Sequence, residues 1–359
     1  MPKAKAAFIK GVRQVALGEI EVPDPGAGEA LVQVRRSGIC GSDLHMYFGR
    51  WGVPKVVPGH EIAGEVLGVG PGVTSLAPGE AVCVEPMLPC WKCEACRRGD
   101  TNRCRRRGFI SGSRHGGFAE LLTAPAYALH QLPPSRAGAR YGGQGPPNVS
   151  LDQGALMEPL SVSGRGVRLG QVGPDDAVLV IGGGTIGLAA IAAARAYGAR
   201  TILCSAKHEH QAAMAKTMGA DALVTVDPEK LPGQVKELTQ GGADVAIETV
   251  GGAADTMTPA AKCLRDGGRL VLLGAFPEAV EVELGAVVYH EITVIGSNCY
   301  GATGGVRDFQ HSLDLVASGK VDLSPLITHR FALDDMQRAF EAAADKSTGA
   351  IKVMIEPSA

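Results

Sequence analysis

One stretch of the chain constrains the fold more than any other: an apolar run that breaks abruptly into glycines. Residues 178–188 read V-L-V-I-G-G-G-T-I-G-L, so a strand-like run is followed at once by a helical pattern. Gly182, Gly184 and Gly187 fit the spacing G-x-G-x-x-G of dinucleotide-binding βαβ units. In such units the first glycine allows a tight turn, the second lets the backbone approach a pyrophosphate, and the third lets helix and strand pack closely.

The start of the helix expected after these glycines is the second part of the motif. Thr185 and Ile186 open that helix, whose unpaired N–H groups and positive dipole end can face phosphate groups. The motif predicts a dinucleotide site. A glycine-rich turn in an ordinary βαβ unit is the alternative that the motif alone leaves open.

Length and composition favour a two-domain globular protein. The chain has 359 residues, which is long for a single core, with 45% apolar and 20% charged residues. A formal net charge of −2 gives no reason to expect nucleic acid or a membrane surface as a partner. Residues 1–10 contain lysines but no long apolar segment, which argues against a secretory signal peptide, so we expect a cytoplasmic location.

The order of apolar runs changes along the chain. Residues 1–75 and 118–123 alternate as β-strands do, whereas from residue 177 strands and helices follow each other. Expected strands of this second part cover 177–182, 201–205, 222–226, 244–249, 269–274 and 293–297. Expected helices cover 151–170, 185–198, 208–218, 229–239, 253–265, 308–318 and 333–344. Six strands with intervening helices predict an α/β fold with a doubly wound parallel sheet.

The ends of that repeating pattern suggest an inserted domain. The last strand, 350–355, has no partner in the expected parallel sheet and is predicted to return to the β-rich first part. We therefore predict a catalytic domain of residues 1–162 plus 303–359 and a dinucleotide-binding domain of residues 163–302. Residues 133–149, rich in Pro, Gly and Arg, are predicted to form an exposed loop of no assigned role.

Four of the nine cysteines are crowded into one short segment. They are Cys90, Cys93, Cys96 and Cys104. Four thiolates from one loop can close a tetrahedral shell around Zn²⁺ with no open position, which is typical of a structural site. The alternative is a cluster of reduced thiols or disulfides. The arginine-rich run that follows is explained as a solvated basic face that also eases thiolate formation.

A second group of potential zinc ligands is dispersed along the chain. Cys40 lies in the segment G-I-C-G-S-D-L-H, His60 and Glu61 lie in P-G-H-E, and Glu158 lies in M-E-P-L. Cysteine, histidine and glutamate all bind zinc. Spacing alone does not bring these four together, and each has a plain alternative, such as a buried thiol for Cys40 or a surface charge for Glu61.

Taken together, these segments resemble the zinc-dependent medium-chain alcohol dehydrogenases over nearly the whole chain. The resemblance rests on residues 38–45 with 58–61, on the four-cysteine loop and on the glycines of 182–187, in the family's order. The segment M-E-P-L-S at 157–161 resembles the polyol and threonine dehydrogenase branch. The resemblance implies a GroES-like, β-rich catalytic domain into which the Rossmann domain is inserted, with the active site in the cleft between them.

The resemblance also implies roles for individual residues. Cys40 and His60 match ligands of a catalytic zinc, with Glu158 or Glu61 as further ligands. Ser42 matches the hydroxyl that takes the substrate proton, and His45 matches the residue that passes it to solvent. Asp43 matches a carboxylate that orients a ligand histidine. Zinc with one exchangeable position can lower the pKa of a bound alcohol, which agrees with this assignment.

The cofactor is predicted from the end of the second strand of the nucleotide domain. An NAD site usually has an acidic residue there, which binds the ribose 2′-OH. Here the strand ends in Cys204-Ser205-Ala206-Lys207, with Ala206 at the family's aspartate position. We expect NAD(P), with NADP favoured, because no carboxylate would repel a 2′-phosphate and Lys207 can bind one. Ser205 and Lys207 are thus candidate cofactor residues, although Glu209 would weaken the argument if the strand ended later.

The predicted reaction is reversible oxidation of a secondary alcohol, a polyol or a cyclic alcohol, to a ketone. Two alternatives stay open: a zinc-free enone or quinone reductase of the same superfamily, and a non-catalytic nucleotide-binding protein. The substrate is not predicted, since Tyr47, Phe48 and Trp51 can line a pocket or belong to the core. By resemblance, we expect a homo-oligomer, a tetramer or a dimer.

Overall fold

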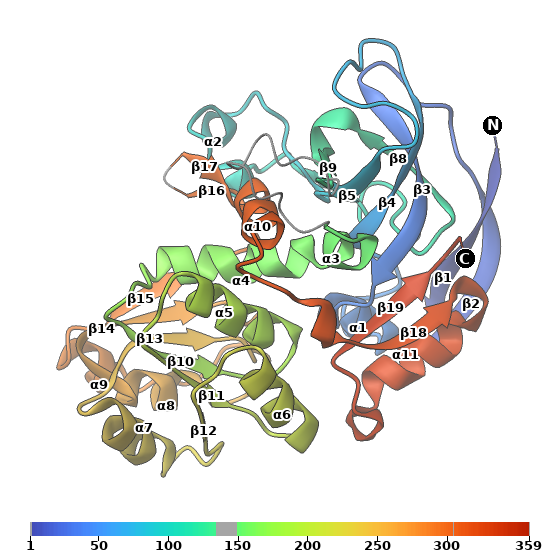
Figure 1. Ribbon diagram of the computed structural model, residues 1–359. Helices are drawn as coiled ribbons and strands as arrows, with labels where there is room; N and C mark the ends of the chain where they lie inside the picture. Colours follow the sequence, from blue (N-terminus) through green and yellow to red (C-terminus); the bar gives the residue numbers. More distant parts are fainter. Residues whose placement is uncertain (1, 134–148, 304, 359) are drawn as a thin grey trace. The chain divides into compact units, whose positions relative to one another are not determined.

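The computed structural model describes residues 2–133, 149–303 and 305–358 (Figure 1). The chain separates into two compact units. The first unit comprises residues 1–158, 313–319 and 326–359, and the second comprises residues 159–312 and 320–325. The predicted loop at 133–149 lies almost entirely outside the described residues. No helix in the described part of the chain combines the length and the apolarity that a membrane crossing requires.

A six-stranded parallel sheet forms the centre of the second unit, in the order β12-β11-β10-β13-β14-β15. Its strands are β10 (Ala177–Ile181), β11 (Thr201–Ser205), β12 (Ala222–Val224), β13 (Ala243–Glu248), β14 (Leu264–Leu272) and β15 (Thr293–Gly296). Along the sheet the strand numbers fall from β12 to β10 and then rise from β13 to β15, so the sequence order reverses between β10 and β13. This arrangement confirms the predicted doubly wound sheet. In such sheets ligands bind beyond the carboxyl ends of the strands at the point of reversal.

Helices cover both faces of this sheet. They are α4 (Met157–Leu169), α5 (Thr185–Ala196), α6 (Glu209–Thr217), α7 (Leu231–Thr239), α8 (Met257–Lys262) and α9 (Leu284–Val288). Helices α7, α8 and α9 lie together along one face, and α4 and α5 lie on the other (Figure 1). Every residue of β10 is buried, as expected for a central strand covered on both faces. A short hairpin, β16 (Ala302–Thr303) with β17 (Val306–Arg307), precedes α10 (Asp308–Ala317).

The first unit is built on a mostly antiparallel seven-stranded sheet, in the order β18-β19-β3-β4-β5-β9 with β8 also paired to β3. Its strands are β3 (Glu29–Gly38), β4 (Glu61–Val69), β5 (Ala81–Val84), β8 (Leu121–Pro125), β9 (Leu129–Gln131), β18 (Ile327–Ala332) and β19 (Lys352–Glu356). Smaller pairs are β1 (Lys3–Gly11) with β2 (Gln14–Glu21), and β6 (Met87–Leu88) with β7 (Gly108–Phe109). The final strand β19 pairs with β3, so the chain returns to its first part as predicted.

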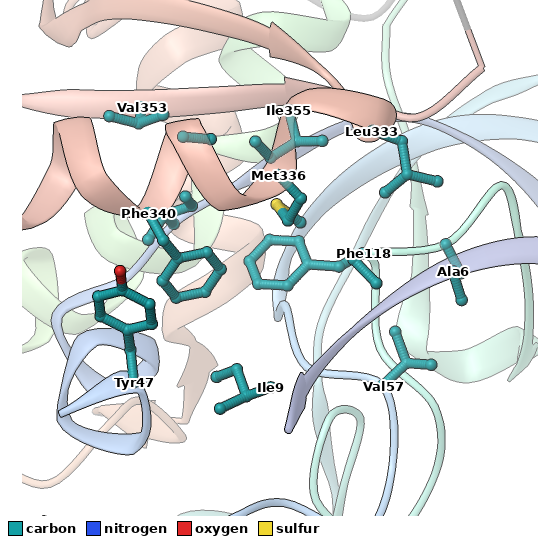
Figure 2. Packing of buried hydrophobic residues seen from close by; sticks show 14 of the residues in the cluster. Ala6, Ile9, Tyr47, Val57, Phe118, Leu333, Met336, Phe340, Val353 and Ile355 are labelled. Atoms are coloured by element: carbon teal, nitrogen blue, oxygen red, sulfur yellow. The ribbon is translucent and has the colours of Figure 1, made fainter. Parts of the chain in front are cut away.

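Three helices of the first unit complete this layer: α1 (Gly41–Tyr47), α3 (Leu151–Ala155) and α11 (Met336–Ala344). The four-residue α2 (Glu94–Arg97) lies in the cysteine loop. Figure 2 shows the core beneath α11, where Phe118 and Phe340 meet edge to face at 5.9 Å between ring centroids. Tyr47 and Ile355 border the same core, and Tyr47 is only 3% exposed. Tyr47 is therefore a core residue at the C-terminal end of α1.

Two predicted helices differ from the structure. The helix expected over 151–170 is interrupted at Leu156, which ends α3 and precedes α4. A capping box between Ser150 and Gln153 fixes the start of α3, and Pro159 lies in the first turn of α4, where proline is tolerated. The helix expected over 253–265 is only the six residues of α8, because β14 already begins at Leu264.

Candidate functional site

Helix α1 carries most of the residues predicted to act in catalysis. Cys40 caps its N-terminus, and the Cys40 backbone N–H donates to Asp43 Oδ2 at 2.9 Å. Asp43 is fully buried, and burial raises the pKa of its carboxyl group. Asp43 Oδ1 lies 3.9 Å from His60 Nδ1, close enough for electrostatic attraction and too far for a hydrogen bond. The structure thus places Asp43 beside the histidine that it was predicted to orient.

His60 directly precedes β4 and lies at the centre of this group. Its side chain is buried, and Ser42 Oγ lies 3.5 Å from His60 Nε2. Burial lowers the pKa of His60, but a hydrogen bond to Cys40 and the negative charges of Cys40, Asp43 and Glu158 outweigh it, so the pKa lies well above its ordinary value. Cys40, Ser42 and His60 are therefore immediate neighbours, although His60 comes from a different segment of the chain than Cys40 and Ser42.

Glu158 completes the group from the first turn of α4. It is 6% exposed, and burial raises the pKa of its carboxyl group to about 7 despite the favourable charge of His60. A cysteine, a histidine and a glutamate, of which the histidine and the glutamate are buried and the cysteine is partly buried, form a donor set that suits Zn²⁺. A divalent cation would relieve the crowding of negative charge that perturbs these groups.

Glu61, the other predicted ligand, has a different partner. Lys352 Nζ lies 2.7 Å from both Glu61 carboxylate oxygens, and it also donates to the Ile39 backbone oxygen at 2.9 Å. Burial alone would lower the pKa of Lys352. The negative charge of the Glu61 carboxylate outweighs this effect, so the pKa of the lysine is raised. Gly38 makes room for Glu61, because a Cβ at position 38 would collide with the carboxylate. The sequence offers one signal for Lys352: a single lysine at the start of an apolar strand.

His45 lies at the other end of α1, next to an exposed tryptophan. Its imidazole stacks on the Trp51 ring with centroids 4.7 Å apart and planes 25° from parallel. Burial, followed by the charge of Arg50, lowers the pKa of His45. The lowered pKa favours the neutral imidazole, the form that can accept a proton. Trp51 is 51% exposed and is not a core residue.

The four clustered cysteines converge in space. Their sulfur atoms all lie within 4.8 Å of one another, and all four thiols are free. Hydrogen bonds, first to the Lys92 backbone, lower the pKa of Cys90 to about 6, whereas burial raises that of Cys96 to about 12. Among the residues that the structure describes, this is the one group of metal-binding side chains that gathers this closely. Cys40, His60 and Glu158 approach one another less tightly.

The glycine motif adopts the predicted strand–turn–helix geometry in the second unit. Gly182 has a positive φ of 109°, a conformation that favours glycine. At Gly187 a Cβ would collide with the Gly182 backbone oxygen, so glycine is needed for the close approach of α5 to β10. A Cβ on Gly184 would meet open space instead, and no side chain caps the N-terminus of α5. Thr185 and Ile186 begin α5, and the positive end of the helix dipole lies at this N-terminus.

A cavity of about 530 Å³ lies beside this loop. It is lined by the glycines of 182–184, by Ser205 and Lys207 from the end of β11, and by His208. Helix α6 begins at Glu209, which is not among the described residues that line the cavity. The basic pair of Lys207 and His208 thus lies where an NAD site usually has a carboxylate. His208 was not predicted as a cofactor residue from the sequence, in which it is only the first residue of the expected helix 208–218.

Comparisons with known proteins agree with this geometry. Residues 26–134 match the model of the alcohol dehydrogenase GroES-like domain, and residues 185–318 match that of zinc-binding dehydrogenases. L-idonate 5-dehydrogenase of Vitis vinifera is 34% identical, with 97% of this chain and 93% of that protein covered. L-threonine 3-dehydrogenase of Pyrococcus furiosus is 33% identical over 95% of each chain. Sorbitol dehydrogenase of Bacillus subtilis is 32% identical over 99% and 97%.

Solved structures show the same relationship. A putative zinc-binding dehydrogenase from Sinorhizobium meliloti, bound to NADP, has a TM-score of 0.85 and 31% identity over 99% of this chain and all of that one. Galactitol-1-phosphate dehydrogenase from Escherichia coli has a TM-score of 0.86 and 28% identity over 98% and 100%. The chain therefore belongs to the zinc-dependent medium-chain alcohol dehydrogenases, in the branch of the polyol and threonine dehydrogenases. It is an oxidoreductase, and the predicted fold and family are confirmed.

Proposed function

We propose that this protein oxidises a secondary alcohol, of the polyol or cyclic class, to a ketone with NAD(P), and reduces the ketone in the reverse direction. The observation that carries the proposal is the group of Cys40 with the buried His60 and Glu158, and with the Ser42 hydroxyl 3.5 Å from His60. The relatives named sorbitol and L-idonate dehydrogenase support the polyol class. We take residues 1–162 plus 303–359 as the catalytic domain and 163–302 as the dinucleotide domain.

The catalytic metal in this proposal is zinc held by Cys40, His60 and Glu158. When bound, zinc supplies a Lewis acid that lowers the pKa of an alcohol, and the nicotinamide supplies the hydride acceptor. Glu61 stays with Lys352, because both of its oxygens already accept from the ammonium group. Ser42 takes the alcohol proton, and the neutral His45 passes it towards solvent. Asp43 holds His60 in place through its charge and the N-terminus of α1 through its bond to the Cys40 backbone.

A second zinc is assigned to Cys90, Cys93, Cys96 and Cys104. Four convergent sulfur atoms leave no open position, so this metal would have a structural role and would pin the cysteine loop. Two zinc ions per chain are therefore expected by elemental analysis. A Cys40→Ser variant should retain one of them, lose hydride transfer and still bind the dinucleotide; undiminished turnover in this variant would refute the ligand role.

We favour NADP as the dinucleotide. Lys207 and His208 at the cavity wall can bind a 2′-phosphate, and the place of the usual acidic residue is taken by Ala206. The NADP-bound relative from Sinorhizobium meliloti is consistent with this preference. Titration with NAD and NADP tests it directly: tighter binding of NAD would overturn the preference and leave the reaction class intact.

A homo-oligomer and a cytoplasmic location complete the proposal. Strand β15 ends the parallel sheet, and Val294 on it is 43% exposed. The neighbouring Leu284, Val288 and Tyr289 are 67%, 67% and 85% exposed, which is unusual for large apolar side chains unless another chain covers them. Sedimentation equilibrium of the wild type and of Val294→Lys tests this: a monomeric wild type would contradict it.

The two alternatives make different predictions. A zinc-free reductase would show no metal at Cys40 and His60 and would reduce enones or quinones. A non-catalytic protein would bind zinc and dinucleotide but oxidise no alcohol in a broad panel. The zinc-type donor set of Cys40, His60 and Glu158 argues against the first, and the Ser42 and His45 geometry argues against the second.

A further inference from the structure

A fully buried glutamate in the second unit has no part in the mechanism described above. Glu248 is the last residue of β13 and is 0% exposed. It pairs with Ile181 of β10 and with Leu272 of β14, so it lies at the carboxyl ends of the central strands, where the sheet order reverses. A buried carboxylate is costly unless it is well bonded, so its presence at this position calls for an explanation.

One carboxylate oxygen of Glu248 organises the segment that follows it. Oε1 accepts from the Val250 N–H at 2.8 Å, from the Gly251 N–H at 2.9 Å and from the Thr256 hydroxyl at 2.9 Å. Two successive backbone N–H groups that converge on one negative oxygen form an anion nest. Gly251 and Gly252 adopt the left-handed φ values of 60° and 68° that such a turn requires. The carboxylate therefore defines the conformation of residues 249–256, which we call the Glu248 loop.

The Glu248 loop is a wall of the dinucleotide cavity. Thr249, Val250, Ala254, Asp255 and Thr256 line that cavity together with the glycine motif. Thr249 also ties the loop to the motif, since its backbone N–H and hydroxyl donate to the Ile181 oxygen at 3.0 and 2.8 Å. A change in the loop would thus reach both sides of the cavity.

The second carboxylate oxygen explains why a neutral side chain at position 248 would not hold the Glu248 loop in the same way. Glu248 Oε2 is buried and has no hydrogen-bond partner in the described part of the chain. It faces Gly274, where a Cβ would collide with it. A glutamine at position 248 would place its NH₂ group either here without an acceptor or against the three donors that now meet Oε1.

We propose that Glu248 is a positioning residue for the dinucleotide: its carboxylate folds the Glu248 loop into the wall against which the cofactor binds. This inference rests on the proposed function, because it assumes that the cavity takes a dinucleotide. Glu248 does not touch the reacting atoms and acts through the loop. Its loss should therefore weaken dinucleotide binding far more than it slows turnover at saturating dinucleotide.

The test compares Glu248→Gln with the wild type and with Glu237→Gln, an exposed glutamate of α7, in the full-length zinc-loaded protein. Binding of NADPH and NADH is measured by nicotinamide fluorescence, alongside kcat at saturating dinucleotide. We expect the Kd of the Glu248→Gln variant to rise at least about tenfold, because charge-assisted bonds are lost, while its kcat stays within about twofold. Glu237→Gln should match the wild type.

An unchanged Kd in Glu248→Gln would overturn the inference, as would a loss of kcat and stability with Kd unchanged. If that variant does not fold, Thr256→Val and Thr256→Ser decide: the valine should raise Kd and the serine should restore it, and equal Kd values would again overturn the inference. A wild type that binds neither dinucleotide would refute the proposed function itself. If the wild type binds the dinucleotide and Glu248→Gln binds it with the same Kd, only the role of Glu248 is refuted.

Discussion

Replacing Lys352 by methionine should destabilise the first unit by an amount typical of a broken buried ion pair. The lysine and Glu61 are 2% and 1% exposed at their side chains, and their charged atoms are 2.7 Å apart. At an effective dielectric constant of about 20, that separation corresponds to an attraction on the order of 6 kcal/mol. Part of this attraction energy is offset because the variant no longer has to desolvate a lysine. The net decrease in the free energy of unfolding is roughly 3–5 kcal/mol.

The assay is urea unfolding followed by tryptophan fluorescence. Trp51 and Trp91, the two tryptophans of the chain, both belong to the first unit, so the signal reports on the unit that contains the ion pair. Lys3→Met is the matched control, because the Lys3–Glu19 pair has both side chains 66% exposed. An exposed pair of this kind contributes less than about 1 kcal/mol.

A second substitution separates the ion pair from other effects of the lysine. Adding Glu61→Gln to Lys352→Met removes the unpaired charge, so the double variant should recover at least about 2 kcal/mol of the loss. Zinc content is measured in each variant, so that loss of metal is not mistaken for loss of the pair. The reasoning is refuted if Lys352→Met costs no more than the Lys3 control, or if the double variant is no more stable than Lys352→Met alone.

Three further predictions concern other parts of the molecule. Burial alone would raise the pKa of Asp152, but hydrogen bonds from Arg330 and Arg36 outweigh it and lower the pKa. The bonds of Asp152 to these two arginines therefore stabilise the protein above about pH 4, and this stabilisation is lost as the pH falls below that value. Asp152→Asn should therefore cost about 1–2 kcal/mol at pH 7 in chemical unfolding, with a difference from the wild type that disappears as the pH falls below about 3; a constant difference would contradict this. Gly187→Ala, which forces a methyl group against the Gly182 oxygen, should weaken dinucleotide binding at least about tenfold in a fluorescence titration, and wild-type affinity would show that α5 can move aside. Cys104→Ser should release one zinc per chain and lower the thermal midpoint, and an unaltered metal content would remove the structural assignment.

The sequence was most informative where one local pattern determines the backbone. The apolar run and glycines of residues 178–188 predicted β10, the turn and the start of α5, because Gly182 and Gly187 there each meet a local steric demand. The four cysteines are close in sequence, so their convergence was also predictable. The interruption at Leu156 was missed, since the sequence was interpreted as one continuous helix over 151–170.

Contacts between distant segments were beyond the reach of the sequence. Lys352 is 291 residues from Glu61 in the chain, and no pattern near either residue reveals that β19 brings them together. Glu248 was covered only by the expected strand 244–249, and its role depends on donors that face inward only after the loop has folded. The proposed zinc ligands, Cys40 and His60 with Glu158 or Glu61, were predicted from family resemblance, because separate segments of the chain supply them.

The transfer of a label from substrate to cofactor tests the central claim most directly. A secondary alcohol panel of polyols and cyclic alcohols, deuterated at the carbinol carbon, is incubated with NADP and with NAD, and the reduced dinucleotide is analysed by mass spectrometry. We predict that deuterium enters the dinucleotide with the wild type, more readily with NADP, and that Cys40→Ser abolishes the transfer while its dinucleotide affinity is retained. Absence of label with the zinc-loaded wild type across the panel, or equal transfer by Cys40→Ser, would contradict the assignment of this protein's zinc site and reaction.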